Sequence, residues 1–66
     1  MNVVINGNAE DVADGCTVEG LLDGRLESSK GVAVAVNAEV VPKSTWSSRS
    51  LAEGDHVELL TAAQGG

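Results

Sequence analysis

Residues 32–37 constrain the fold more than any other stretch, because they read Val-Ala-Val-Ala-Val-Asn. β-Branched residues alternating with alanine favour an extended strand. Both sides of this strand would be apolar, which is typical of a central position in a sheet. We expect Val34 and Val36 to face a covering helix, and Ala33 and Ala35 to lie on the opposite, open side. With 66 residues, the chain has room for one small domain around this strand.

The N-terminal part of the chain predicts a hairpin followed by a short helix. Residues 2–6 form a first strand, Asn6-Gly7 is a strong tight-turn dipeptide, and residues 9–13 form a weaker second strand. Thr17 is the expected helix N-cap. The residues expected on the buried face of the helix are Val18, Leu21, Leu22 and Leu26. Gly20 and Gly24 each weaken this helix by about 1 kcal/mol relative to alanine, so it depends on packing against a sheet.

The C-terminal part predicts two further strands. A short strand at residues 40–41 ends at Pro42, because proline cannot donate to a sheet. The polar stretch after it contains one aromatic residue, Trp46, which we expect to anchor a satellite of the core next to a helical turn over residues 46–51. The last strand covers residues 56–61. Its expected inward residues are Val57 and Leu59, and its outward residues are His56, Glu58 and Leu60.

These elements predict an α+β fold, with a mixed sheet of four to five strands and one main helix packed on one face. We expect residues 1–61 to form the domain and residues 62–66 to form a flexible tail. On the open face, a small apolar patch would contain Val4, Ala33, Ala35 and Leu60. A patch of this kind is a candidate docking surface, and we expect Leu60 and Ala35 to contact a partner protein.

The charge balance narrows the class of partner. Ten acidic residues against four basic ones give a formal net charge of −6, which disfavours nucleic acids and anionic membrane surfaces. No apolar run is long enough to span a bilayer, and the N-terminus lacks the pattern of a signal peptide. Cys16 is the single cysteine, so no internal disulfide forms, which fits a reducing cytoplasm. An acidic surface suits approach to a basic patch on another protein.

The side chains do not predict an active site of the chain's own. His56 has no second histidine and no cysteine at ligand spacing, so we expect no metal site. Cys16 is expected to be a small buried hydrophobic residue. The serines lack a partner histidine in a suitable position for a catalytic triad. We therefore expect a protein that is not an enzyme and that binds no cofactor itself.

The sequence closes on Gly65-Gly66. Neither residue has a Cβ, so nothing shields a carboxylate on Gly66, and the backbone can adopt angles closed to other residues. Fully extended, residues 62–66 would reach about 16 Å beyond the last strand. This tail could thread a narrow channel into another protein's active site. The reactive group would then be the Gly66 carboxylate, with Gly65 as its steric companion.

The order of elements, together with four local features of the sequence, resembles a known family. Asn37 with Val41-Pro42, Ser44 before Trp46, Glu53-Gly54-Asp55 before the last strand and the Gly65-Gly66 end are similar to the thiamin-pathway sulfur carrier proteins. The resemblance covers essentially the whole chain. It implies a ubiquitin-like β-grasp fold.

The resemblance also implies a mechanism. An E1-like activating enzyme would adenylate the Gly66 carboxylate with its own ATP and Mg²⁺, and a sulfur donor system would convert the adenylate to a thiocarboxylate. Thiazole synthase would then take the sulfur into the thiazole moiety of thiamin. Two related functions remain open: a sulfur carrier for molybdopterin, and a ubiquitin-like modifier joined to lysines. A binding module in which the glycines have no role is a third alternative.

Overall fold

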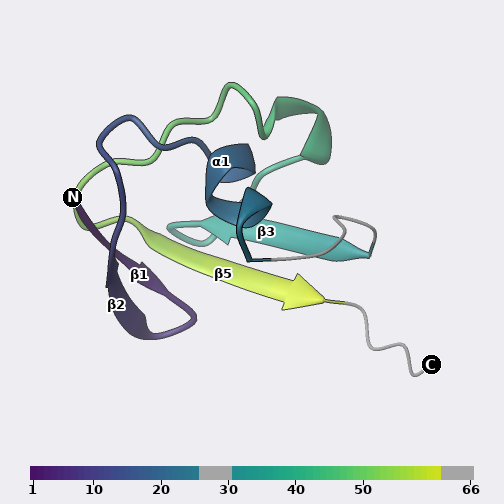
Figure 1. Ribbon diagram of the computed structural model, residues 1–66. Coiled ribbons are helices and arrows are strands. Elements are labelled where there is room, and N and C mark those ends of the chain that lie inside the picture. The colour runs from purple at the N-terminus through teal and green to yellow at the C-terminus, as the bar shows by residue number, and fades with distance from the viewer. Residues whose placement is uncertain (26–30, 62–66) are drawn as a thin grey trace.

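The last strand of the chain lies at the centre of the sheet. The computed structural model describes residues 1–25 and 31–61, and within these residues it contains one five-stranded sheet in the order β2-β1-β5-β3-β4 (Figure 1). β1 and β5 are parallel, and the other neighbouring strands are antiparallel. The elements are β1 (Asn2–Ile5), β2 (Asn8–Asp11), α1 (Val18–Asp23), β3 (Val32–Val36), β4 (Glu39–Val40), the 3₁₀ helix η1 (Lys43–Thr45) and β5 (His56–Thr61). The expected α+β class, mixed sheet and single covering helix are confirmed.

The β1–β2 hairpin turns at Asn6-Gly7, as the sequence predicts. Both residues have positive φ, 51° and 85°, which is the conformation that this dipeptide tolerates best. A two-residue turn places Asn8 opposite Ile5, so β2 begins at residue 8 and ends at Asp11. The expected bounds of 9–13 are therefore wrong.

The helix α1 (Val18–Asp23) is bounded by the capping residues Thr17 and Gly24. The Oγ1 atom of Thr17 accepts a hydrogen bond from the Gly20 N–H at 3.1 Å, which confirms Thr17 as the N-cap. Gly24 is the C-cap, so its expected cost inside the helix does not apply; Gly20 alone bears that cost. Leu26 lies outside the described residues, as do residues 28–30 of the expected loop.

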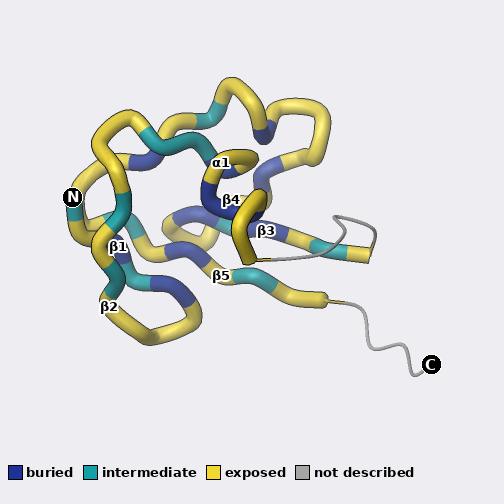
Figure 2. Tube along the Cα trace, in the orientation of Figure 1, coloured by how far each residue is buried: buried dark blue, intermediate teal, exposed yellow. Residues whose placement is uncertain are grey.

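The core fills the space between α1 and the sheet (Figure 2). Its buried members are Val3, Ile5, Val18, Leu21, Leu22, Val34, Val36, Val41, Trp46, Leu51 and Val57. Val34 and Val36 face the helix side, as expected, and Ala33 and Ala35 lie on the other side. The core is thus one cluster built from both ends of the chain.

Two expectations about the segment after β3 are wrong. The short strand β4 covers Glu39–Val40 rather than 40–41, because a tight turn at Asn37-Ala38 follows β3 directly. The helical turn is η1, before Trp46, and not at residues 46–51.

Trp46 belongs to the main core and not to a satellite of it. The residue is 4% exposed, and its Nε1–H donates to the Val41 carbonyl at 2.9 Å. Backbone bonds tie this region to α1, with the Glu19 N–H donating to the Trp46 carbonyl and the Val18 N–H to the Arg49 carbonyl. The tryptophan is therefore held by the start of the helix as well as by its own loop.

Candidate functional site

The candidate reactive end follows β5. Residues 62–66, with Gly65 and Gly66, lie outside the described residues, so the expected tail and the roles of its glycines stay predictions. The structure places the point from which these residues continue: Thr61 is the last residue of β5 and pairs with Val32 of β3.

The side chain of Asn6 holds β5 beyond the end of β1. Its Oδ1 accepts a hydrogen bond from the Leu59 N–H at 2.9 Å, and its Nδ2 donates to the Leu59 carbonyl at 3.3 Å. Because β1 ends at Ile5, the amide of Asn6 acts in place of one further residue of a parallel strand. The N-terminal turn therefore fixes the segment that leads to the tail.

The expected open-face residues do lie on one face of the sheet. The register pairs Ala33 with Leu60 and Ala35 with Glu58, and paired residues share a face. Leu60 is 67% exposed. The structure brings Leu60 and Ala35 onto one surface, while their contact with a partner stays a prediction.

Val40 is a member of this face that the sequence reasoning missed. It pairs with Ala35 from the edge strand β4 and is 72% exposed, whereas Val41 is buried. Val40 and Val41 are both apolar, so the sequence does not show which of them faces the core. It shows only that adjacent strand residues face opposite sides.

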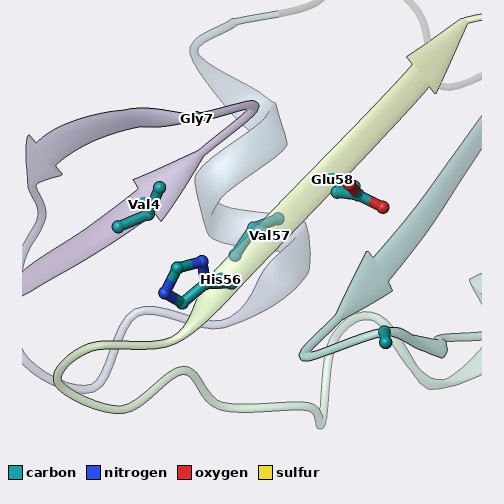
Figure 3. Close-up of a pocket in the computed structure, with 6 residues that line it drawn as sticks. Val4, Gly7, His56, Val57 and Glu58 are labelled. Atoms are coloured by element: carbon teal, nitrogen blue, oxygen red, sulfur yellow. The ribbon is translucent and has the colours of Figure 1, made fainter.

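A shallow depression of about 320 Å³ lies on the same side of the sheet (Figure 3). It opens between the tips of the two hairpins. The lining residues are Val4, Gly7, Ala38, His56, Val57 and Glu58. Gly7 has no side chain and Ala38 has only a methyl group, so the sides of the depression that these residues form are shallow. The depression therefore adds a hollow with a mainly apolar lining and two polar side chains, His56 and Glu58, to this face.

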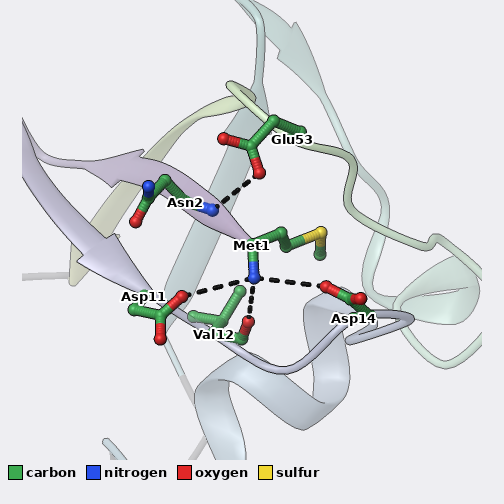
Figure 4. Close-up of polar contacts among 6 residues, drawn as sticks. All are labelled: Met1, Asn2, Asp11, Val12, Asp14 and Glu53. Carbon is green, nitrogen blue, oxygen red and sulfur yellow. Dashed lines mark hydrogen bonds and ion pairs between the residues drawn. The ribbon is translucent and has the colours of Figure 1, made fainter.

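The N-terminus forms a separate charged cluster beside α1 (Figure 4). The Met1 amine contacts Asp14 at 3.2 Å and Asp11 at 3.3 Å, and it donates to the Val12 carbonyl at 2.7 Å. The hydrogen bond to Asp14 is the largest cause of the raised pKa of this amine, and Asp11 raises it further. These contacts fasten the residue before β1 to the end of β2 and to the segment after it, away from the depression.

Residues 1–25 and 31–61 contain no group of three or more histidine, cysteine or acidic side chains that could hold a metal ion. Over the same residues, no helix is long and apolar enough to cross a membrane. Cys16 is half-buried beside the core, and its thiol donates to the Thr17 carbonyl at 3.4 Å.

A hairpin, a helix across the sheet and a final strand inserted beside the first define a ubiquitin-like protein of the β-grasp class. Two solved structures of a thiamine biosynthesis protein (ThiS) from Geobacter metallireducens share this fold. The crystal structure has a TM-score of 0.85 and 30% sequence identity, with all of both chains covered. The NMR structure has a TM-score of 0.82 and 30% identity, covering all of this chain and 88% of that one.

The sequence model of the ThiS family matches residues 3–66, and the chain belongs to that family. The sulfur carrier protein ThiS of Escherichia coli K12 is 32% identical over 66 residues, covering the full length of both chains. A thiazole synthase of Paramagnetospirillum magneticum is 38% identical over 66 residues. This chain spans 20% of that synthase, so a ThiS-like segment there is part of a much longer protein.

Proposed function

We propose that the protein is a sulfur carrier of thiamin biosynthesis. The observation that carries this proposal is the match to the ThiS family through residue 66, which includes Gly65 and Gly66. The full-length similarity to the E. coli sulfur carrier supports the same function. In this proposal the folded domain is recognised, and the Gly66 carboxylate reacts.

The proposed chemistry has three steps on Gly66. A carboxylate is a poor electrophile, because the group that must leave would be an oxide. An E1-like activating enzyme joins the carboxylate to the α-phosphate of ATP with Mg²⁺, releasing pyrophosphate and leaving an acyl adenylate. The terminal sulfur of a cysteine-derived persulfide on the sulfur donor system then displaces AMP, so that a carbon–sulfur bond forms where the carbon–oxygen bond to AMP breaks. A thiol of the donor system next cleaves the sulfur–sulfur bond of this acyl disulfide and is itself left in a disulfide. The product is a thiocarboxylate.

Thiazole synthase is the proposed acceptor of the sulfur. The similarity to a segment of a thiazole synthase supports an interaction between the carrier and thiazole synthase. The protein itself is a co-substrate, with the catalytic groups, ATP and Mg²⁺ belonging to its partners. Gly65 serves as the slim residue that lets Gly66 enter a narrow site. The lone Cys16 suits the cytoplasm, where we place this reaction.

The test is the intact mass of the protein after incubation with the activating enzyme, ATP and a sulfur donor. We expect a mass gain equal to one oxygen-for-sulfur exchange, located on Gly66 by fragmentation. A variant with one bulky residue added after Gly66 keeps the domain and serves as the matched control, and it should gain nothing. Absence of the exchange in the unmodified protein with a competent enzyme contradicts the proposal.

A genetic test separates the proposed function from the two related functions, a molybdopterin sulfur carrier and a protein modifier. A thiazole auxotroph should be rescued by the wild-type gene and not by a gene lacking Gly66. Rescue of a molybdopterin mutant instead identifies a carrier of that pathway. Conjugates of higher mass in cell extracts, with no rescue, identify a protein modifier.

A further inference from the structure

Among the described residues, Glu58 is the acidic side chain that lies with the apolar residues at the middle of the open face. It pairs with Ala35, which in turn pairs with Val40, so the three residues form one row across β5, β3 and β4. Leu60 lies on the same face of β5, two residues or about 7 Å along the strand. Any flat apolar partner that covers Leu60 and Val40 therefore covers the carboxylate as well.

Covering this carboxylate without a partner charge is costly. An ionised group removed from water without a counter-charge loses its hydration, which would offset much of the gain from burying Leu60 and Val40. Among the described residues, no ion pair includes Glu58. Arg25, the one basic side chain in those ion pairs, bonds Glu10, which pairs with Val3 on the helix side. Since the described residues show no cation paired with Glu58, a partner that covers this face can supply one.

The depression gives such a cation room. Glu58 forms part of its lining, and His56 lies two residues back on the same face of β5 (Figure 3). Gly7 and Ala38 keep the entrance open between the two hairpin tips. An apolar side such as that of Val4 suits the methylene stem of a lysine or arginine, while the charged head lies against the carboxylate. The net charge of −6 attracts a basic surface from a distance.

We propose that the depression at Glu58 receives an arginine or lysine side chain of the activating enzyme, and that this ion pair sets the affinity of the carrier for that enzyme. The inference rests on the proposed function, since it names how the same partner recognises the folded domain. Glu58 is a binding residue in this proposal and takes no part in the chemistry at Gly66.

The test compares Glu58→Gln and Glu58→Lys with Glu39→Gln and Glu39→Lys. Glu39 is exposed, lies on the same sheet and changes the net charge equally, but it pairs with Val36 and so belongs to the opposite face. Two readouts are used with the purified activating enzyme: the Kd without ATP, and KM and kcat for pyrophosphate release with ATP. Thermal unfolding checks that each variant is folded.

We expect Glu58→Gln to raise Kd and KM about tenfold and Glu58→Lys about a hundredfold, with kcat unchanged at saturating carrier. The Glu39 variants should stay within about threefold of wild type, and added salt should weaken the wild type more than Glu58→Gln. If the wild type is adenylated and the Glu58 variants match the Glu39 variants, this inference is wrong and the proposed function stands.

Other outcomes would contradict the proposed function, the docking inference or both. If Kd depends on Glu58 but no pyrophosphate is released, the docking inference stands and the proposed function fails. If the wild type neither binds nor reacts, both are overturned. A fall in kcat with Kd and KM unchanged would also contradict the inference, because it would give Glu58 a role in the reaction instead of in binding.

Discussion

The amide of Asn6 offers the sharpest test of how the domain holds its last strand. Its two hydrogen bonds to the backbone of Leu59 are exposed, at 2.9 and 3.3 Å. Asn6→Gly removes both bonds and keeps the left-handed backbone, since glycine adopts positive φ freely. Each such bond contributes about 0.5–1 kcal/mol net, so we expect the free energy of unfolding to fall by about 1–2 kcal/mol.

Two further substitutions divide this loss into its causes. Asn6→Ala loses the same bonds and also forces a residue with a Cβ to adopt φ near 51°, which adds about 1 kcal/mol. Asn6→Asp keeps an acceptor for the Leu59 N–H but turns a carboxylate oxygen toward the Leu59 carbonyl, for a loss of about 1 kcal/mol. The matched control is Asn8→Asp, which adds the same charge at an exposed position and should change the value by less than about 0.5 kcal/mol.

Urea unfolding followed by tryptophan fluorescence measures these values. Trp46 is the single tryptophan and is 4% exposed, so its emission reports loss of the core. For a chain of 66 residues, 1 kcal/mol corresponds to about 7 °C in Tm. An Asn6→Gly variant as stable as wild type would refute the role of the amide. Equal stability of Asn6→Gly and Asn6→Ala would refute the cost assigned to placing a residue with a Cβ at positive φ.

Three other predictions concern turns, caps and pH. Ala38 has φ 70°, so Ala38→Gly should stabilise the protein by about 0.5–1 kcal/mol in the same urea assay, and destabilisation would contradict the strain. Thr17→Ala removes the cap on Gly20 and should cost about 1 kcal/mol, whereas Thr17→Ser should retain most of it. Folding raises the pKa of the Met1 amine above its usual 8.0, so its stabilising contribution is complete below pH 8 and is lost as pH rises through the raised value. Urea midpoints from pH 7 to 10 should therefore fall less in Asp14→Asn than in wild type, and parallel pH profiles would exclude the contribution.

The regular elements were predictable because their residues repeat with a clear period. The alternation in β3 and β5 gave their faces correctly, and Asn6-Gly7 gave the first turn. The place of Trp46 was not predictable, because the residues around it are polar and lack a period. The Glu19 N–H, which donates to the Trp46 carbonyl, comes from a helix 27 positions earlier (46 − 19), so no local pattern encodes it.

Part of the candidate site could also be predicted from the sequence, and part could not. The open-face positions of Ala35 and Leu60 followed from the two-residue repeat of their strands. Val40 and the depression were missed because they depend on the register of a two-residue strand and on two left-handed turns that line the same depression. Gly65 and Gly66 were singled out by chemistry alone, and their roles await the mass measurement.

The sheet order has a consequence for the synthesis of this protein. β5 leaves the ribosome last among the strands, yet β1 and β3 can be joined only through it. A nascent chain must therefore wait for residues 56–61 before its sheet can close. Truncated translation products that stop before this strand cannot form the domain and are exposed to proteases. A chain whose synthesis stops before residue 56 therefore lacks the strand that joins the two halves of the sheet.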